Sequence, residues 1–255
     1  MRIALAGKGG AGKTTISATL ARLKARAGAQ VVAIDADSNP NLGTALGIDP
    51  ELLARSGSLP FSLVSRRLGS AALTAPIDEV VRTHGLEGPD GVRVVSMGAP
   101  GHADEGCLCS AHVTVSALLS DLGGAPGTVA VVDMEASPEH LSRGTARHAD
   151  VLLLVTEPYF RSLEAVRRLA ELATELPIET VAVVVNKVRS AAESEAVADF
   201  CDRHGLTRLG EVPWSDDVTR ADQAARPLLD TAPDGAAVAA IAELSTRLQQ
   251  TVSVR

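Results

Sequence analysis

Short runs of apolar, mostly β-branched residues recur along the chain, and most are followed by turn residues and a segment with helical spacing of apolar positions. Runs that are apolar at nearly every position are typical of strands buried on both faces, as in parallel sheets. The pattern predicts strands at Ile3–Ala6, Val31–Asp35, Val92–Ser96, Val129–Asp133, Val151–Thr156, Val181–Asn186 and, more weakly, Leu209–Val212. It predicts helices at Lys13–Ala27, Val113–Leu122, Pro138–Ala146, Ser162–Glu175, Ala191–Arg203 and Ala236–Gln250.

Regular alternation of strands and helices predicts an α/β fold: a doubly wound, mostly parallel sheet flanked by helices. The 255 residues suffice for one large domain or two small ones. We expect a single domain spanning 1–255. The stretch from about 50 to 91 is less regular and rich in Gly, Ser and Pro. We interpret it as helices and loops inserted after the second strand.

Charge and composition narrow the classes of partner. The formal net charge is −7, which argues against bulk affinity for nucleic acid or an anionic membrane. Aromatic residues make up 2% of the chain, so few side chains can stack on bases. No apolar run approaches the roughly 18–20 residues of a membrane helix. Three cysteines without a secretory segment indicate the reducing cytoplasm.

The last predicted helix has the apolar spacing of a face that docks on a core, at Val238, Ile241, Leu244 and Leu248. A membrane-targeting helix would instead carry Lys and Arg along its polar side. We therefore expect neither nucleic acid nor membrane as a partner.

The segment Gly7–Thr15 matches the phosphate-loop pattern G-x-x-x-x-G-K-[ST], between a predicted strand and a predicted helix. Glycines let successive backbone N–H groups turn toward one anion at the start of a helix. Lys13 would reach the β- and γ-phosphates, and the Thr14 hydroxyl would coordinate Mg²⁺. The residues expected to contact ATP or GTP here are Gly9, Gly10, Ala11, Gly12, Lys13, Thr14 and Thr15.

Further charged residues accompany the loop. Lys8 is one of only four lysines in the chain, and a second ammonium beside the loop could serve the nucleotide of a partner subunit. Asp35 and Asp37 end one predicted strand, and Asp133 ends another. Carboxyl ends of parallel strands lie beside a phosphate loop, so these carboxylates suit Mg²⁺ and the attacking water. Capping of strand–helix turns is the competing interpretation.

Together these pieces resemble the deviant-Walker-A ATPases, the family of MinD, ParA, the nitrogenase iron protein and the arsenical-pump ATPases. The resemblance implies that Lys8 contacts the partner's nucleotide in a homodimer that ATP brings together. It implies that Asp37 polarises the attacking water and that Asp133 is the Walker-B-like carboxylate. It further implies that Asn186, followed by Lys187, reads the adenine amino group, and that the loop containing Pro213 covers the adenine.

Within this family, three features are similar to the CooC-type nickel-insertion ATPases. The segment Asp35–Leu42 is similar to D-A-D-P-N-x-N-L, with Ser38 at the proline position. The segment Asp133–His140 is similar to D-M-E-A-G-x-E-H, with Ser137 at the glycine position. The third feature is Cys107-Leu108-Cys109 before an apolar helix.

Cys107 and Cys109 together supply two soft ligands, too few for a closed tetrahedral site. Two copies across a dimer would supply four, which suits Ni²⁺, Zn²⁺ or a [4Fe–4S] cluster. The alternative is that both are small buried apolar side chains. His112 is either an accessory ligand or a helix cap, the resemblance makes His140 a candidate relay, and Cys201 fits a core position.

The leading hypothesis is a dimerising ATPase that binds ATP, ADP and Mg²⁺ and inserts nickel into a client metalloenzyme such as carbon monoxide dehydrogenase. One alternative is a ParA- or MinD-like partitioning or positioning ATPase. The other is an iron–sulfur, ATP-dependent reductase like the nitrogenase iron protein.

Overall fold

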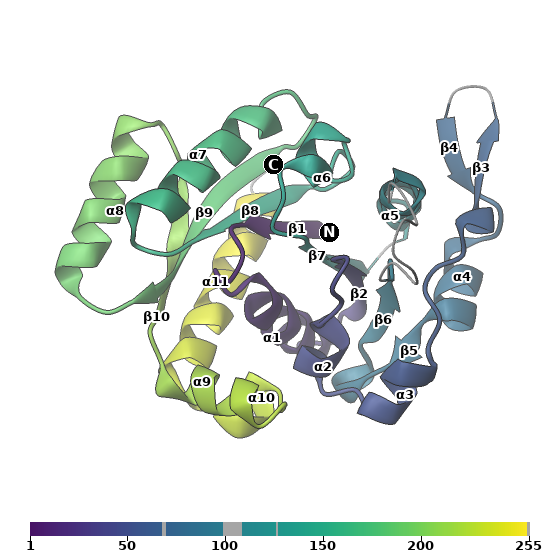
Figure 1. The fold of residues 1–255 in the computed structure, drawn as a ribbon, viewed down its shortest axis with the longest axis horizontal. Coiled ribbons are helices and arrows are strands. Elements are labelled where there is room, and N and C mark those ends of the chain that lie inside the picture. The colour runs from purple at the N-terminus through teal and green to yellow at the C-terminus, as the bar shows by residue number, and fades with distance from the viewer. Residues whose placement is uncertain (68–69, 99–108, 126, 254–255) are drawn as a thin grey trace.

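The computed structural model describes residues 1–67, 70–98, 109–125 and 127–253, and an eight-stranded sheet forms its centre (Figure 1). The strand order is β10-β9-β8-β1-β7-β2-β6-β5, and every neighbouring pair is parallel except β5 with β6. The strands of this sheet are β1 (Arg2–Gly7), β2 (Gln30–Ala36), β5 (Leu86–Glu87), β6 (Arg93–Ser96), β7 (Thr128–Met134), β8 (Val151–Thr156), β9 (Thr180–Val188) and β10 (Arg208–Pro213). The predicted doubly wound α/β fold is confirmed.

Helices cover both faces of the sheet (Figure 1). The longer ones are α1 (Lys13–Arg26), α4 (Ile77–His84), α5 (Cys109–Leu122), α7 (Phe160–Ala173), α8 (Ala191–Arg203), α9 (Asp216–Gln223) and α11 (Ala236–Ser253). The shorter ones are α2 (Leu42–Leu46), α3 (Pro50–Arg55), α6 (Glu139–Ser142) and α10 (Leu228–Thr231), with 3₁₀ turns at Phe61–Leu63 and Pro89–Gly91.

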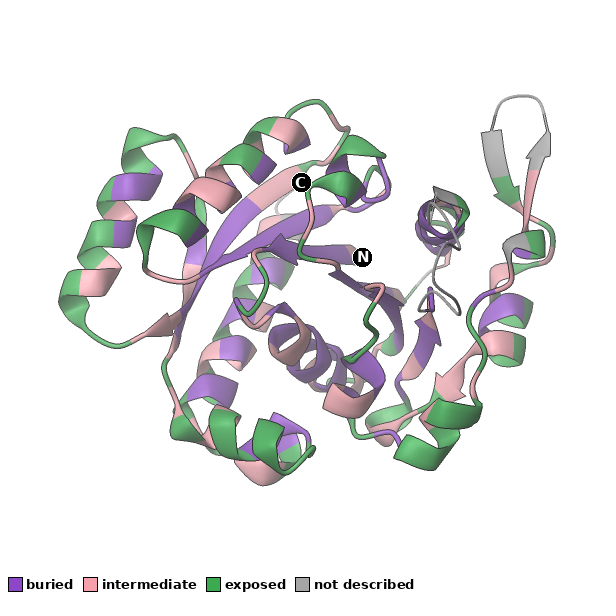
Figure 2. Cartoon of the chain, viewed as in Figure 1, coloured by how far each residue is buried: buried purple, intermediate pink, exposed green. Residues whose placement is uncertain are grey.

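Two hydrophobic cores result, one on each face, because successive side chains of a strand point to opposite sides. In β1, Ile3 and Leu5 join the core beneath α1 and α11, whereas Ala4 and Ala6 join the core beneath α5, α7 and α8. The central strands are buried along almost their whole length (Figure 2). Burying an Ile or Leu side chain completely contributes about 1.5–3 kcal/mol, so the sheet is a rigid base for its loops.

The last helix docks as its spacing predicted. Val238, Ile241, Leu244 and Leu248 are all buried in the core on the α1 face. Cys201 of α8 is likewise buried in the opposite core, as expected.

Two segments differ from the prediction. The region 50–91 contains strands as well as helices: β5 extends the main sheet, and β3 (Val64–Arg67) pairs with β4 (Ser70–Leu73) in an antiparallel hairpin that projects at the edge of the molecule (Figure 1). The helix predicted at Pro138–Ala146 is helical only over Glu139–Ser142. Gly144, at φ +67°, turns the chain out of the helix there.

A buried arginine ties the helix after the phosphate loop to two distant segments. Arg22 of α1 donates from Nε to Asp90 at 2.6 Å and from both terminal nitrogens to Asp230 of α10 at 2.8 Å. Its side chain is only 4% exposed, while the neighbouring Arg26, which pairs with the same two carboxylates, is 43% exposed. Asp90 and Asp230 therefore each pair with one buried guanidinium, that of Arg22, and with one exposed guanidinium, that of Arg26.

Arg22→Met should lower the free energy of unfolding by about 1.5–3 kcal/mol, because it removes the charge-assisted hydrogen bonds that a buried guanidinium donates to Asp90 and Asp230. Arg26→Met is the matched control and should cost less than about 1 kcal/mol, because exposed ion pairs are weak. Urea denaturation measures both. Equal losses in the two variants would contradict the role assigned to burial.

Candidate functional site

The loop between β1 and α1 curls around the ammonium group of Lys13. Lys13 Nζ donates to the carbonyl oxygens of Gly7 at 3.2 Å and Lys8 at 3.4 Å. Burial lowers the pKa of Lys13, and the carboxylates of Asp133, Asp37 and Glu135 act in the opposite direction. The ammonium group is thus held inside the loop by backbone oxygens and nearby negative charge.

Gly12 is required at its position for two reasons. Its φ of +94° lies in the left-handed region, and a Cβ there would sit 2.1 Å from Nδ2 of Asn186. Asn186 closes the loop from the side by donating this Nδ2 to the carbonyl oxygen of Ala11 at 2.7 Å. Its Oδ1 accepts from the backbone N–H of Lys187 at 2.9 Å. The residue predicted to read adenine therefore also braces the phosphate loop.

Asp133 connects the end of β7 to the first turn of α1. Its carboxylate accepts hydrogen bonds from the Thr14 hydroxyl at 2.6 Å and the Ser17 hydroxyl at 3.2 Å. Burial raises the pKa of Asp133 to about 6, although the two hydroxyls and Lys13 oppose the rise. A loop threonine beside a strand-end aspartate is the oxygen donor set that holds Mg²⁺ in P-loop proteins. These residues fit that ion.

Asp35 lies directly beside Asp133, at paired positions of β2 and β7. It accepts from the backbone N–H of Leu42 at 2.8 Å and of Asp37 at 3.3 Å. Burial, reinforced by the charge of Asp133, raises the pKa of Asp35 to about 7. Asp35 thus organises the turn, whereas Asp37 is only partly buried and lines the cavity beside the loop.

That cavity has a volume of about 440 Å³. Its floor is the phosphate loop and Lys13, and its walls include Asp37, Asn186 and Lys187. Pro213 and Trp214 at the end of β10 also line the cavity, and the guanidinium of Arg189 lies 3.9 Å from the centre of the indole ring. The structure therefore brings the predicted loop, Asp37, Asn186, Lys187 and Pro213 to one cavity. Trp214 was not predicted, and as the only tryptophan it had no pattern to mark it.

Lys8 points away from its own loop. Its Nζ lies 3.0 Å from the Tyr159 hydroxyl and 5.0 Å from the centre of that ring. The Tyr159 hydroxyl donates to Glu157 at 2.9 Å, and the other oxygen of Glu157 accepts from Lys187 at 2.7 Å. Lys187 Nζ also donates to the carbonyl oxygen of Gly10 at 2.6 Å, so this chain of contacts reaches both sides of the loop.

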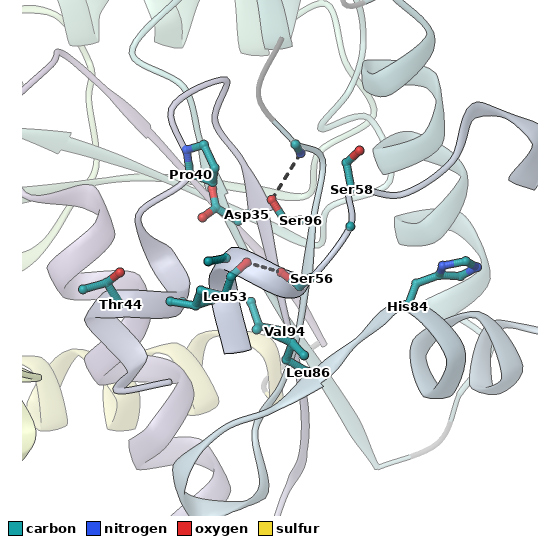
Figure 3. A pocket seen from close by; sticks show the side chains of 14 residues that line it. Asp35, Pro40, Thr44, Leu53, Ser56, Ser58, His84, Leu86, Val94 and Ser96 are labelled. Atoms are coloured by element: carbon teal, nitrogen blue, oxygen red, sulfur yellow. Dashed lines mark hydrogen bonds between the residues drawn. The ribbon is translucent and has the colours of Figure 1, made fainter. Parts of the chain in front are cut away.

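A second cavity, of about 410 Å³, lies beside the turn that follows β2 (Figure 3). Asp35 and Pro40 line it from this turn, Leu53 and Ser56 from the region of α3, and His84 from α4. Asp35 lines this cavity and Asp37 lines the one beside the phosphate loop, so the end of β2 reaches both cavities.

Two histidines pack against each other at the start of α6. The rings of His140 on α6 and His112 on α5 lie 4.4 Å apart between centres, edge to face at 69°. His140 is 1% exposed. Burial lowers the pKa of His140 to about 3, with the neighbouring His112 acting in the same direction and a backbone hydrogen bond with Ala36 in the opposite one, so the ring is neutral at physiological pH.

The predicted cysteine pair lies outside what the structure describes. Cys107 is not among the described residues, and Cys109 is described only as the first residue of α5, without its side chain. Within residues 1–67, 70–98, 109–125 and 127–253, no three His, Cys, Asp or Glu side chains gather into a group that could hold a metal ion. None of the helices in the same ranges has the length and apolarity needed to cross a bilayer.

Comparison with known proteins shows the family to which this chain belongs. The family model described as the CobQ/CobB/MinD/ParA nucleotide binding domain matches residues 3–228. The chain belongs to this CobQ/CobB/MinD/ParA family. The resemblance inferred from the sequence is thereby confirmed.

Relatives of known sequence and structure agree with this assignment. The carbon monoxide dehydrogenase accessory protein CooC of Rhodospirillum rubrum is 35% identical over 246 residues, 91% of each chain. The nitrogenase iron protein 2 of Methanothermobacter thermautotrophicus is 27% identical over 244 residues, covering 91% of this chain and 83% of that one. The MinD protein of Pyrococcus horikoshii complexed with Mg-ADP superposes with a TM-score of 0.73 at 16% identity, covering 99% of this chain and 97% of that one. That likeness shows the shared fold of the CobQ/CobB/MinD/ParA family.

The raised pKa values of Asp35 and Asp133 predict a pH dependence of the nucleotide-free protein. An aspartate whose pKa rises from 3.8 to about 6 or 7 on folding binds more protons when folded, so stability falls as pH rises between about 4 and 7. These two aspartates favour the folded state more at pH 5 than at pH 7.5, whereas His140, whose pKa is lowered to about 3, contributes in the opposite direction up to about pH 6.5.

Asp35→Asn should remove the contribution of Asp35 to this pH dependence, because an amide does not ionise in this range. The amide keeps one oxygen that can accept from one of the two backbone N–H groups. Urea denaturation at several pH values measures the slope. An unchanged slope in the variant would show that other groups control it.

Proposed function

We propose that this protein is an ATP-hydrolysing maturation factor that dimerises on Mg-ATP and inserts nickel, or a related metal, into a client metalloenzyme such as carbon monoxide dehydrogenase. The observation that carries the ATPase part is the contact of Thr14 with Asp133 beneath the loop, with Asp37 on the same cavity. The maturation part rests on the relationship to the carbon monoxide dehydrogenase accessory protein, at 35% identity over 91% of each chain.

Each loop residue has a task in ATP hydrolysis. Lys13 exchanges its contacts with the Gly7 and Lys8 carbonyls for the β- and γ-phosphate oxygens. The Thr14 hydroxyl, which donates to Asp133 in this structure, would hold Mg²⁺, and the ion would supply positive charge beside the phosphates. Asp37 orients the water whose oxygen attacks the γ-phosphorus, and the bond to the β–γ bridging oxygen breaks to release ADP.

Lys8 links hydrolysis to dimerisation. Within a single protomer, the ammonium group of Lys8 donates to the Tyr159 hydroxyl and lies outside its own phosphate loop. An approaching second protomer brings a nucleotide whose phosphates are a stronger partner for an ammonium group than a neutral phenol. Lys8 then leaves Tyr159 and neutralises charge in the partner's site. Cys107 and Cys109 of both protomers supply thiolates to the metal cargo where the two protomers meet. After hydrolysis the protomers separate and the metal is released.

The alternatives make different demands. An iron–sulfur reductase would carry a cluster at the cysteines, and the relationship to a nitrogenase iron protein keeps this reading open. A partitioning or positioning ATPase would need an affinity for DNA or lipid, which the net charge of −7 does not favour. The metal bound at the cysteines, and ATP-dependent cosedimentation with DNA or liposomes, separate the three functions.

Lys8→Ala should keep ATP binding but abolish ATP-dependent dimerisation, because it removes only the ammonium group meant for the partner. Emission of Trp214, the only tryptophan, reports nucleotide binding in its cavity, and light scattering reports dimers. Tyr159→Phe is the control: it frees Lys8 without removing it and should leave dimerisation intact. A Lys8→Ala variant that dimerises like the wild type would reject this role.

Replacing Cys107 and Cys109 by Ser should abolish stoichiometric binding of nickel or zinc while leaving ATP binding unchanged. Cys201→Ala is the matched control, since Cys201 is a buried core residue and should not affect metal binding. Metal analysis of anaerobically prepared protein with a non-hydrolysable ATP analogue gives the stoichiometry. Full metal content in the double variant would exclude the C-x-C site.

A further inference from the structure

We propose that Ser38 and Glu135 are positioning residues for ATP hydrolysis, because the hydrogen bond between their side chains fixes Asp37 relative to the phosphate loop. Ser38 Oγ donates to Glu135 Oε1 at 3.1 Å. Ser38 belongs to the turn after β2, and Glu135 directly follows β7, so the contact joins the two turns that carry the carboxylates of the nucleotide site. The inference rests on the proposed function, in which Asp37 orients the attacking water.

The first argument is how the turn after β2 is held. At its base, the buried carboxylate of Asp35 accepts from the backbone N–H groups of Asp37 at 3.3 Å and of Leu42 at 2.8 Å. These bonds close the turn on itself without setting the place of its tip. Ser38, near the tip, reaches outside the turn, and a hydroxyl that donates to a carboxylate forms a stronger bond than one between neutral groups.

The second argument is what Ser38 lies between. Asp37 lines the cavity beside the phosphate loop, and its Oδ1 accepts from the backbone N–H of Asn39 at 2.8 Å. That bond orients the carboxylate and leaves Oδ2 to orient a water. Ser38 is the residue between the acceptor and the donor of this bond, so anchoring its side chain steadies both. Proline, found at this position in the similar pattern D-A-D-P-N-x-N-L, has no hydroxyl to donate.

The other half of the contact is seated on the phosphate loop. Ala136, next to Glu135, lines the nucleotide cavity, and a Cβ placed on Gly9 would lie 3.6 Å from the Cβ of Ala136. The charge of Glu135 also opposes the lowering of the pKa of Lys13 that burial causes. Because Glu135 follows the loop in this way, its hydrogen bond carries the position of the loop to the turn that bears Asp37.

A second contact joins the same two turns nearer the core. The ring of His140 has a backbone hydrogen bond with Ala36, the last residue of β2. This contact holds the base of the turn, whereas Ser38 holds its tip. Loss of the Ser38 hydroxyl should therefore loosen Asp37 without displacing the strand ends, and it should cost less activity than loss of Asp37 itself.

Steady-state ATP hydrolysis by the full-length protein with Mg²⁺ tests the proposal. Ser38→Ala should lower kcat about tenfold and leave KM and ATP affinity unchanged, because a misplaced Asp37 affects the reaction and not the phosphate loop. Ser38→Thr keeps a hydroxyl and Glu135→Gln keeps an acceptor oxygen, so both should retain most of the wild-type kcat. Ser142→Ala is the control, because its exposed hydroxyl bonds within α6, to the carbonyl oxygen of Glu139, and it should match the wild type.

A double variant shows whether Ser38 acts through Asp37. Asp37→Ala should lower kcat further than Ser38→Ala does. Adding Ser38→Ala to Asp37→Ala should then cause no additional loss, because the side chain that Ser38 positions is already gone. Losses that multiply in the double variant would overturn this role.

The remaining outcomes are also decisive. If Ser38→Ala keeps the wild-type kcat while Asp37→Ala loses it, this inference fails and the proposed function stands. A raised KM with unchanged kcat would likewise overturn it, since the contact would then shape nucleotide binding. If the wild-type protein does not hydrolyse ATP, both fail. Urea denaturation followed by Trp214 emission shows whether each variant is folded. Glu135→Ala removes the same hydrogen bond from the other side and should lower kcat as Ser38→Ala does.

Discussion

The carboxylate of Asp133, held by the hydroxyls of Thr14 and Ser17, is the contact on which the rest of the site depends. It fastens the first turn of α1 to the end of β7 and thereby fixes the phosphate loop over the sheet. These hydrogen bonds do not fully offset the cost of burying the carboxylate: the pKa of Asp133 rises to about 6, and that of neighbouring Asp35 to about 7. Two buried acids side by side, with the ammonium of Lys13 nearby, form a site whose charge balance improves when a cation arrives. Under the proposed function, binding of Mg-ATP would therefore also raise the stability of the fold.

The loop is braced from its outer side as well. Asn186 and Lys187 donate to the backbone of Ala11 and Gly10, and Glu157 joins Lys187 to Tyr159. These residues come from β9 and the loop after β8, so the strands on one side of β1 hold the loop while Asp133 holds it from the other. Lys8 is the exception, because its contact is with an exposed tyrosine rather than with the loop. In the proposed dimer, Lys8 is the side chain of this network that contacts the partner, because leaving an exposed tyrosine costs little.

Local patterns were enough to predict the fold class, the phosphate loop and the strand-end carboxylates. Each of these depends on a few consecutive residues: an apolar run, a glycine-rich turn, and an acid at the end of a strand. The contact of Lys8 with Tyr159 joins residues 151 positions apart, and the His112–His140 pair joins residues of two helices. Nothing local marks either pair, because tertiary packing alone brings them together. The hairpin β3–β4 was missed for a different reason: its strands are four residues each and lie away from the main sheet, so they lack the long apolar runs of the central strands.

The place of β1 in the sheet has a consequence for how the protein is made. β1 is synthesised before both of its neighbours in the sheet, because it pairs with β7 and β8, with Arg2 opposite Ala130 and Ile3 opposite Val151. The loop that follows β1 therefore has no sheet to rest on until β7 and β8 have left the ribosome. Contacts so distant in sequence form slowly, and the early strand stays exposed to chaperones in the meantime. Nucleotide binding is thus a late event in biogenesis, and a truncated nascent chain would carry the whole phosphate-loop motif without being able to use it.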